Sequence, residues 1–299
     1  MKKAVISHIQ VIPDTFRLCA CLGISRSSYY AWRKRSQGEP PVLAKRGPKT
    51  PWSDQVLAAK IREVLTSSLF TGEGHRKVWA RLRHQGIQTS KRRVLRLMRE
   101  NGLLSPGRVG RAHGPKAHDG TITTTTPDEM WGTDMTRTWV AEEGYVAVFI
   151  AIDHCTTECI GIHASKEGNR FEALEPIKQG VRENFDAISQ NVAAGLSLRH
   201  DHGSCYMASV FQSEIKFLGI KSSPSYVREP EGNGCAERFI RTLKEQLLWL
   251  DDFRTLEELQ AALQLFKHRY NNQWLIQRHG HRSPASVRGS FENTLPVAA

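Results

Sequence analysis

The fold is decided by three β-rich runs, MWGTDMTRTWV (130–140), GYVAVFIAIDH (144–154) and CIGIHAS (159–165). The first run alternates as a half-buried strand does, and Gly144 suits the turn that joins it to the second. Downstream, the pattern predicts a helix over 170–185, a strand over 196–200, a helix over 205–218 and a strand over 220–225. Helices are predicted again over 234–249 and 256–270, the last opened by a capping box from Thr255 to Glu258. This order predicts a mixed α/β sheet with helices on its faces.

The residues before this region predict only helices. The pattern of residues 14–35 predicts a short helix, a turn at Gly23 and a second helix capped by Ser25 (DTFRLCACLGISRSSYYAWRKR). This order is typical of a helix-turn-helix motif. A second pair of helices follows, with Ser90 as an N-cap and Gly102 as a stop. We therefore expect a helix-turn-helix (1–38), a linker (39–53), a second helix-turn-helix module (54–105), a basic linker (106–127), an α/β core (128–252) and a C-terminal helical tail (253–299).

Charge is unevenly distributed along the chain. Of 42 Lys and Arg and 30 Asp and Glu, residues 1–120 hold 24 basic and 7 acidic side chains, whereas the remainder holds 18 and 23. A front half of net charge +17 would release counterions from a polyanion, so nucleic acid is the first partner to consider, with a solvated basic surface as the alternative. The helix KRRVLRLMRE (91–100) combines an apolar stripe with a basic one. From the front half we expect DNA contacts from Arg33, Lys34, Arg35, Lys91, Arg92, Arg93 and Arg96.

Cysteine usage and hydropathy exclude several classes of protein. The six cysteines form no CxxC pair and no spaced Cys/His quartet, so neither a disulfide framework nor a zinc finger is indicated. The most apolar stretch, residues 145–152, is too short to span a bilayer, and residues 1–10 lack the apolar core of a secretory signal. We expect a soluble cytoplasmic protein associated with the nucleoid.

Three carboxylates stand at positions that suit phosphodiester chemistry. Asp134 lies in the middle of a predicted strand, where aspartate is disfavoured, Asp201 at the end of the fourth strand, and Glu237 early on a helix. Arg241 and Lys244 follow Glu237 on the same helical face, and with Arg238 they complete the expected DNA contacts. Such chemistry commonly uses two divalent ions held by carboxylate oxygens. Taken singly, Asp201 before its glycine turn is usually explained by turn chemistry, and Glu237 in the first turn of its helix by the helix dipole.

The strings around these residues resemble one family at every point. WGTDMT, DHGSCY and NGCAERFIRTLKEQL, with 35 residues between Asp201 and Glu237, resemble the catalytic blocks of bacterial insertion-sequence transposases that share their core with retroviral integrases. CLGISRSSYYAWRKR, GHRKVWARLRHQGI and KRRVLRLMRENGLLS resemble the family's two helix-turn-helix modules, and RYNNQW with RSPASV its C-terminal region. The resemblance covers nearly the whole chain.

The resemblance implies a ribonuclease-H-like core in which Asp134, Asp201 and Glu237 hold two Mg²⁺ or Mn²⁺ ions, with Lys244 near the DNA end. It further implies a transposase that cleaves the ends of a mobile element and transfers the strand, as a homo-oligomer on double-stranded DNA comprising the element's terminal repeats and the target. The family also implies that the chain is the second reading-frame product of a two-frame element, with an upstream-frame partner or fusion.

The sequence departs from the family's pattern beside Asp201, and it also allows other interpretations of the function. His200 and His202 flank Asp201 where many relatives have other polar residues, which leaves a zinc site as an alternative. Asp153 ends the second β-rich run but lacks the turn context of Asp201, and we interpret it as structural. The rival functions are a non-catalytic helix-turn-helix regulator of DNA and a simple ribonuclease-H-like nuclease. The terminal-repeat and target sequences, the oligomeric state and activity without a fused partner are not predictable from the residues.

Overall fold

The computed structural model describes residues 14–36, 51–107, 124–225 and 233–292. The chain divides into two compact units, Met1–Pro51 and Trp52–Ala299. Most of the linkers predicted at 39–53 and 106–127 lies outside the described residues. In the described part, no helix combines the length and the apolar character needed to cross a bilayer.

The first unit contains two short helices, α2 (Thr15–Cys21) and α3 (Arg26–Ser36). Gly23 has a φ of +61°, which makes the turn between them, and the Ser25 hydroxyl accepts the Ser28 N–H at 3.1 Å as the predicted cap. Cys19 and Tyr29 form a very small buried contact. The predicted helix–turn–helix pattern is confirmed for these residues.

The second unit begins with a three-helix module, α4 (Asp54–Ser67), α5 (His75–His84) and α6 (Lys91–Glu100). Ser53 and Ser90 cap α4 and α6 through their side chains, as the sequence predicts for Ser90. The helices enclose one apolar cluster, formed by Leu57, Ile61, Val64, Val78, Leu82, Ile87, Val94, Leu97 and Met98.

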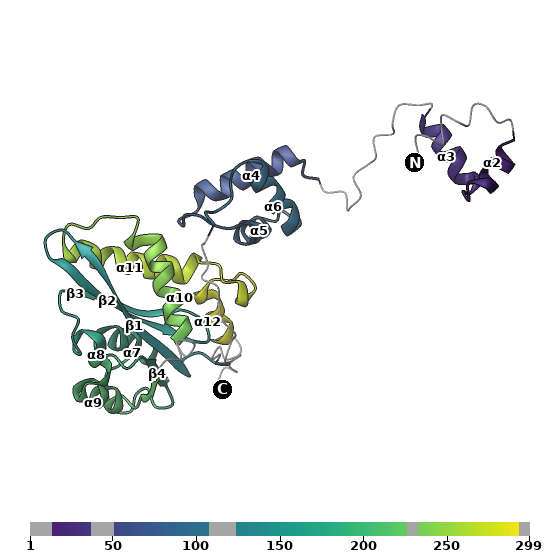
Figure 1. Ribbon diagram of the computed structural model, residues 1–299. Coiled ribbons are helices and arrows are strands. Elements are labelled where there is room, and N and C mark those ends of the chain that lie inside the picture. Colours follow the sequence, from purple (N-terminus) through teal and green to yellow (C-terminus); the bar gives the residue numbers. More distant parts are fainter. Residues whose placement is uncertain (1–13, 37–50, 108–123, 226–232, 293–299) are drawn as a thin grey trace. The chain divides into compact units, whose positions relative to one another are not determined.

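The rest of the unit is built on a five-stranded mixed sheet in the order β3-β2-β1-β4-β5 (Figure 1). β1 (Met130–Val140), β2 (Gly144–Asp153) and β3 (Cys159–Ser165) are antiparallel, whereas β4 (Ser197–His200) runs parallel to β1 and β5 (Lys221–Pro224) parallel to β4. This is the mixed sheet that the three β-rich runs predict.

Helices cover both faces of the sheet (Figure 1). On one face, α10 (Gly234–Leu243) and α11 (Leu256–Gln273) bury a cluster with the even-numbered residues of β2, including Val148 and Ile150. On the other face, α7 (Glu175–Phe185) and α9 (Ser209–Phe217) pack on Trp131 and Phe149. Leu259, Leu263, Phe266 and Tyr270 of α11 lie in the same core as the sheet, so this helix of the predicted C-terminal tail is integral to it.

Three predicted helices are interrupted. The helix predicted over 170–185 starts with a 3₁₀ turn (Glu172–Leu174), and the one over 205–218 is split at Ala208 into α8 (Ser204–Met207) and α9. The helix over 234–249 changes at Lys244 into a π-helical turn, Lys244–Leu248. The capping box of α11 is also incomplete: the Thr255 hydroxyl accepts the Glu258 N–H, but the Glu258 carboxylate accepts from Arg254 N–H instead.

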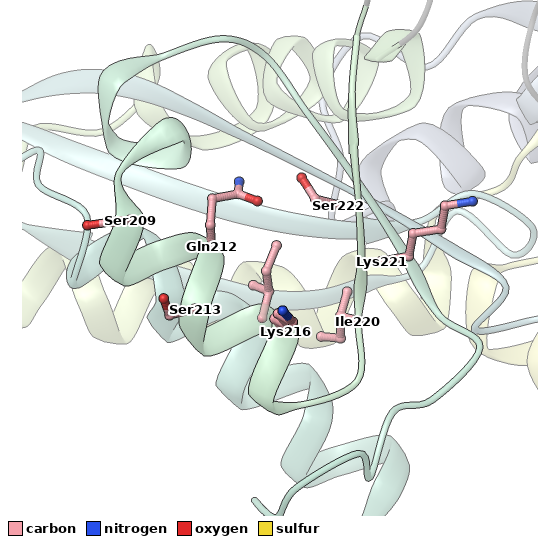
Figure 2. Close-up of a pocket in the computed structure, with 8 residues that line it drawn as sticks. Ser209, Gln212, Ser213, Lys216, Ile220, Lys221 and Ser222 are labelled. Carbon is pink, nitrogen blue, oxygen red and sulfur yellow. The ribbon is translucent and has the colours of Figure 1, made fainter.

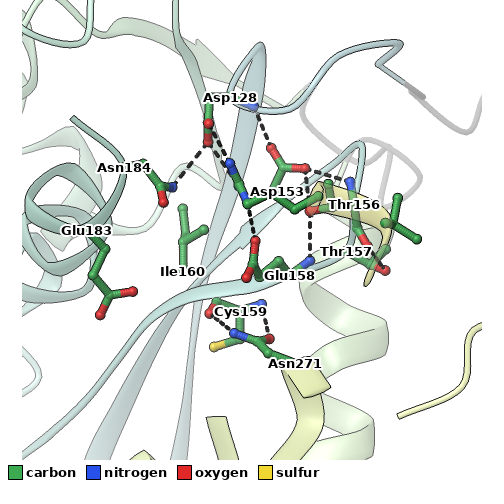
Figure 3. A network of polar contacts seen from close by, with 12 residues as sticks. Asp128, Asp153, Thr156, Thr157, Glu158, Cys159, Ile160, Glu183, Asn184 and Asn271 are labelled. Atoms are coloured by element: carbon green, nitrogen blue, oxygen red, sulfur yellow. Dashed lines mark hydrogen bonds and ion pairs between the residues drawn. The ribbon is translucent and has the colours of Figure 1, made fainter. Parts of the chain in front are cut away.

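A buried polar network joins the C-terminal helix α12 (Pro284–Glu292) to the sheet (Figure 3). Arg288 donates to both Asp128, at 2.7 Å, and Glu158. Asp128 also accepts from the Trp131 indole at 2.9 Å. The Arg288 side chain is only 15 % exposed, so these ion pairs are largely shielded from water. Ion pairs of Arg288 therefore hold helix α12 against the residues that flank the strands.

Candidate active site

Asp134 lies in the middle of β1, on the face covered by α10. It pairs across the sheet with Ile150, whose side chain belongs to the core beneath α10 and α11. Its Oδ1 accepts the Met135 N–H at 2.7 Å. Its side chain is half-buried, so the strand carries a carboxylate where a core side chain would be expected.

Asp201 is the first residue after β4. The parallel register pairs Gly132 with Arg199, and continuing that offset by two residues brings Asp201 level with Asp134. The Oδ1 of Asp201 accepts the Gly203 N–H at 2.8 Å, the hydrogen bond typical of an Asx turn. The side chain is exposed.

Glu237 lies in the first turn of α10. Ala236, Phe239, Ile240 and Leu243 form the buried face of this helix, and Glu237 lies outside it, exposed. Because α10 packs against β1, the helix brings Glu237 to the side of the sheet that bears Asp134. A strand, a strand end and a helix thus each contribute one carboxylate.

The three carboxylates share one electrostatic environment. Burial raises the pKa of Asp134 to about 6, and the negative charges of Asp201 and Glu237 add to that rise, while Lys244 opposes it. Desolvation also raises the pKa of Glu237. In the part of the chain that the structure describes, no three His, Cys, Asp or Glu side chains form a set that could hold a metal ion as they stand. The three carboxylates are therefore close enough to influence one another electrostatically, but in this structure they are not arranged as a complete set of metal ligands.

His200 is structural, a role that the sequence did not reveal. It is fully buried, its Nδ1 lies 2.7 Å from the Asp201 carbonyl oxygen, and its Nε2 lies 2.9 Å from the Ser222 hydroxyl. Desolvation lowers its pKa, which favours the uncharged ring. With both nitrogens engaged, His200 is not available as a zinc ligand, whereas His202 is exposed.

Asp153 is confirmed as structural. It is buried and accepts hydrogen bonds from the Thr156 N–H and hydroxyl, which close the turn between β2 and β3 (Figure 3). It also accepts the N–H of Asp128, which lies just before β1.

The cations expected to contact DNA fall into two groups. On α10 and after it, Lys244 is close enough to lower the pKa of Asp134, Arg238 is exposed, and Arg241 pairs with Glu245 at 2.8 Å. The π-helical turn begins at Lys244, and such turns often occur at functional sites. In the helical modules, Arg33, Lys34 and Arg92 are exposed, and Arg35 belongs to α3.

The remaining three cations of that prediction have partners inside the module. Lys91 lies 4.4 Å above the Trp79 ring. Arg93 and Arg96 both pair with Asp54 at 2.7 Å. The sequence pattern marks all three as a basic stripe, but only the fold reveals these internal contacts, and their role towards DNA stays a prediction.

A separate hollow of about 490 Å³ lies between α9 and β5. Its lining, drawn in Figure 2, combines the apolar Ile215 and Ile220 with polar and basic side chains, namely Ser209, Gln212, Ser213, Lys216, Lys221 and Ser222. No acidic residue lines it, so it is distinct from the carboxylates described above.

Two segments of the chain match models of known protein families. Residues 51–111 match the model of an HTH-like domain, and residues 218–284 match that of an integrase core domain. The chain is 26 % identical over 273 residues to the Escherichia coli transposase InsD for insertion element IS2A/D/F/H/I/K, covering 88 % of this chain and 87 % of that one. The K12-strain InsD transposase of element IS2-9 matches at the same identity, with 85 % of its length covered.

Several solved structures are also similar. A simian T-cell lymphotropic virus intasome in complex with PP2A regulatory subunit B56 gamma covers 80 % of this chain and is matched over 76 % of its own, at 14 % identity and a TM-score of 0.49. The catalytic core of BIV integrase is matched over 97 % of its length and covers 56 % of this chain, at 21 % identity and a TM-score of 0.41.

The curated relatives are matched along nearly their whole length, and the helix-turn-helix-like region precedes the integrase core in this chain. Over most of its length, the chain is therefore similar to insertion-sequence transposases, with a helix-turn-helix-like region and an integrase core.

Proposed function

We propose that this chain is a transposase that binds the ends of its mobile element and catalyses metal-dependent DNA strand cleavage and strand transfer, with Asp134, Asp201 and Glu237 as the catalytic carboxylates. The observation that carries the proposal is the placement of the three carboxylates: Asp201 follows β4 level with Asp134 of β1, and Glu237 lies on the helix that packs against β1. The rise in the pKa of Asp134, to which Asp201 and Glu237 contribute after burial, agrees with this placement. Bringing three carboxylates together from separate elements lowers the stability of the fold, because like charges repel. Such unfavourable arrangements are typical of functional sites.

The donor set fits a hard divalent cation. All three residues offer carboxylate oxygens, the ligands that Mg²⁺ and Mn²⁺ prefer, and the surplus of negative charge at Asp134 is what a cation would relieve. Asp134, Asp201 and Glu237 would hold the metal, two ions per site by the family's expectation. When bound, the ions would activate the attacking oxygen and stabilise the leaving oxygen of the phosphodiester.

The protein's own groups then have distinct tasks. Lys244, close enough to influence Asp134, and the exposed Arg238 would neutralise phosphates at the DNA end, and the helical modules would hold the duplex by its backbone. His200, hydrogen-bonded to the Asp201 carbonyl and to Ser222, would keep the Asp201 turn in place. We further propose Arg33, Lys34, Arg35, Lys91, Arg92, Arg93, Arg96 and Arg241 as residues that act towards DNA.

The experiment uses the full chain, Mg²⁺ and labelled duplexes that carry the element's own ends. Asp201→Asn should abolish end cleavage and strand joining while the affinity for the duplex, measured by gel shift, stays within about twofold, because a neutral amide of the same shape binds Mg²⁺ poorly. Full cleavage by this variant would overturn the assignment. Cleavage without joined products in the native protein would favour a simple nuclease, and binding with neither product would favour a regulator.

A further inference from the structure

The N-terminus of α10 is attached to β1 by one buried side chain. Asn233 directly precedes the helix, is only 6 % exposed, and its Nδ2 donates to the Thr133 carbonyl at 2.9 Å. Asparagine at this position usually caps its own helix by accepting a backbone N–H. Here it makes no such bond, and its amide is hydrogen-bonded to strand β1 instead of to the helix.

Gly132 makes the approach of this amide possible. It lies on the same face of β1 as Asp134, and a Cβ at this position would be 2.9 Å from Asn233 Oδ1 and 2.7 Å from His154 Nε2. Its φ is not positive, so space rather than backbone conformation calls for glycine here. Glycine weakens a strand interior and often marks a site of close approach, which is its role at this position.

The bond connects two of the proposed catalytic residues by short rigid paths. Thr133 is the neighbour of Asp134, and Asn233 precedes Glu237 by four residues, about one helical turn. In the described part of the chain, the buried Oδ1 of Asn233 has no hydrogen-bond partner. An amide retained in spite of that cost is more easily explained by positioning than by stability.

We propose that Asn233 is a positioning residue that fixes Glu237 relative to Asp134, and that Gly132 admits its amide to the strand. The inference rests on the proposed function of these carboxylates. Ligand sets work only when they are held to within about half an ångström, and loss of a supporting hydrogen bond typically costs about 10- to 100-fold in metal affinity or activity.

The first test is Asn233→Ala in the full chain, with Mn²⁺ affinity measured by calorimetry in the absence of DNA. We expect Mn²⁺ binding to weaken about 10- to 100-fold and kcat for end cleavage to fall by a similar factor, with KM for the DNA unchanged. Asn233→Leu keeps the volume and removes the donor, so it should show the same loss if the alanine variant folds poorly. Native Mn²⁺ affinity in both variants would overturn the proposal.

Asn271→Ala is the matched control. Asn271 is another buried asparagine, 8 % exposed, whose amide donates to the Cys159 carbonyl at 2.9 Å (Figure 3). Its loss should lower the melting temperature and leave Mn²⁺ affinity within twofold, because it connects α11 to β3 and neither element carries a proposed ligand. An equal loss of Mn²⁺ affinity in this control would mean that general destabilisation explains the effect, and would contradict the proposal.

A double-mutant cycle tests whether Gly132 acts through Asn233. Gly132→Ala should weaken Mn²⁺ binding as Asn233→Ala does, and the double variant should be no worse than either single one, since both remove the same contact. Fully additive losses would refute this coupling. Asp134→Asn separates the two hypotheses: if it too leaves Mn²⁺ binding and cleavage intact, the proposed function fails, and if it abolishes both while Asn233→Ala does not, only the positioning role fails.

Discussion

Arg93 of α6 reaches back 39 residues to Asp54, the first residue of α4, and places its Nη2 2.7 Å from Oδ1. Arg96 approaches the other oxygen of the same carboxylate, also at 2.7 Å. The hydrogen bonds from these two guanidinium groups hold the pKa of Asp54 at about 2, below its ordinary value of 3.8. A stripe of basic residues that looks like a DNA-binding surface in sequence thus also joins two helices of the module.

Asp54→Asn should therefore destabilise the helical module. The amide keeps the shape but not the charge, and three charge-assisted hydrogen bonds from the two guanidinium groups weaken together. We therefore expect a loss of about 1–2 kcal/mol in the free energy of unfolding after allowing for partial exposure. Urea denaturation followed by circular dichroism at pH 7 measures it. Glu100→Gln is the control, because Glu100 pairs with Arg96 but is 52 % exposed, and it should cost less than about 0.5 kcal/mol.

The same pair predicts a pH dependence of defined sign. Because the folded pKa of Asp54 lies below its unfolded value of 3.8, the stabilisation is fully present above about pH 4 and is lost as the pH falls through about 2. The difference between the native protein and Asp54→Asn should be constant from pH 7 to pH 5 and shrink below pH 4. A difference that grows on acidification would contradict this account.

What the sequence predicts well is set by local pattern. The strands β1, β2 and β3 follow from the β-rich runs, and Asp134 stands out as a carboxylate inside one of them. Asp201 and Glu237 are singled out instead by the resemblance of their flanking strings to the catalytic blocks of a known family. The pairing of Arg93 with Asp54, the amide of Asn233 on β1 and the burial of His200 depend on residues distant in sequence. No periodicity reports such contacts, and the break at Ala208 and the π-helical turn at Lys244 are likewise tertiary outcomes.

Arg288→Met should strongly destabilise the α/β domain. It removes the cation from two carboxylates, Asp128 and Glu158, of which Glu158 already has a pKa raised by burial. Leaving buried charge uncompensated typically costs about 3–5 kcal/mol, and chemical denaturation should show a loss of that order. The deficit should shrink as the pH falls from 7 to 5, because Glu158 can then take up a proton.

Arg254→Met serves as the control for that prediction. Its ion pair with Glu142 has the same chemistry, but the two side chains are 80 % and 50 % exposed. An exposed pair contributes about 0–1 kcal/mol, so this variant should be nearly as stable as the native protein. Equal losses in the two variants would contradict the role assigned to the buried network.

Gly161→Ala should disrupt the packing of α7 on β3. A Cβ at this position would lie 1.9 Å from the Pro176 carbonyl oxygen, so strand and helix would have to separate. Overpacking of this kind costs about 1–3 kcal/mol or more. Gly289→Ala in α12 is the counterpart, since nothing lies within 4 Å of its Cβ. It should stabilise slightly by helix propensity, and thermal melts that place both variants below the native protein would refute the comparison.

The central claim is tested most directly by the single-turnover rate of end cleavage in Mg²⁺, measured for Glu237→Gln beside Glu245→Gln. Each change neutralises one carboxylate, on α10 or on the π-helical turn that continues it about two turns later, but of the two only Glu237 raises the pKa of Asp134. We predict that Glu237→Gln lowers the rate by about three orders of magnitude, the several kcal/mol that metal-ion catalysis supplies, and that Glu245→Gln stays within about tenfold of the native protein. Equal rates for the two variants would contradict the assignment of Glu237 to the catalytic site.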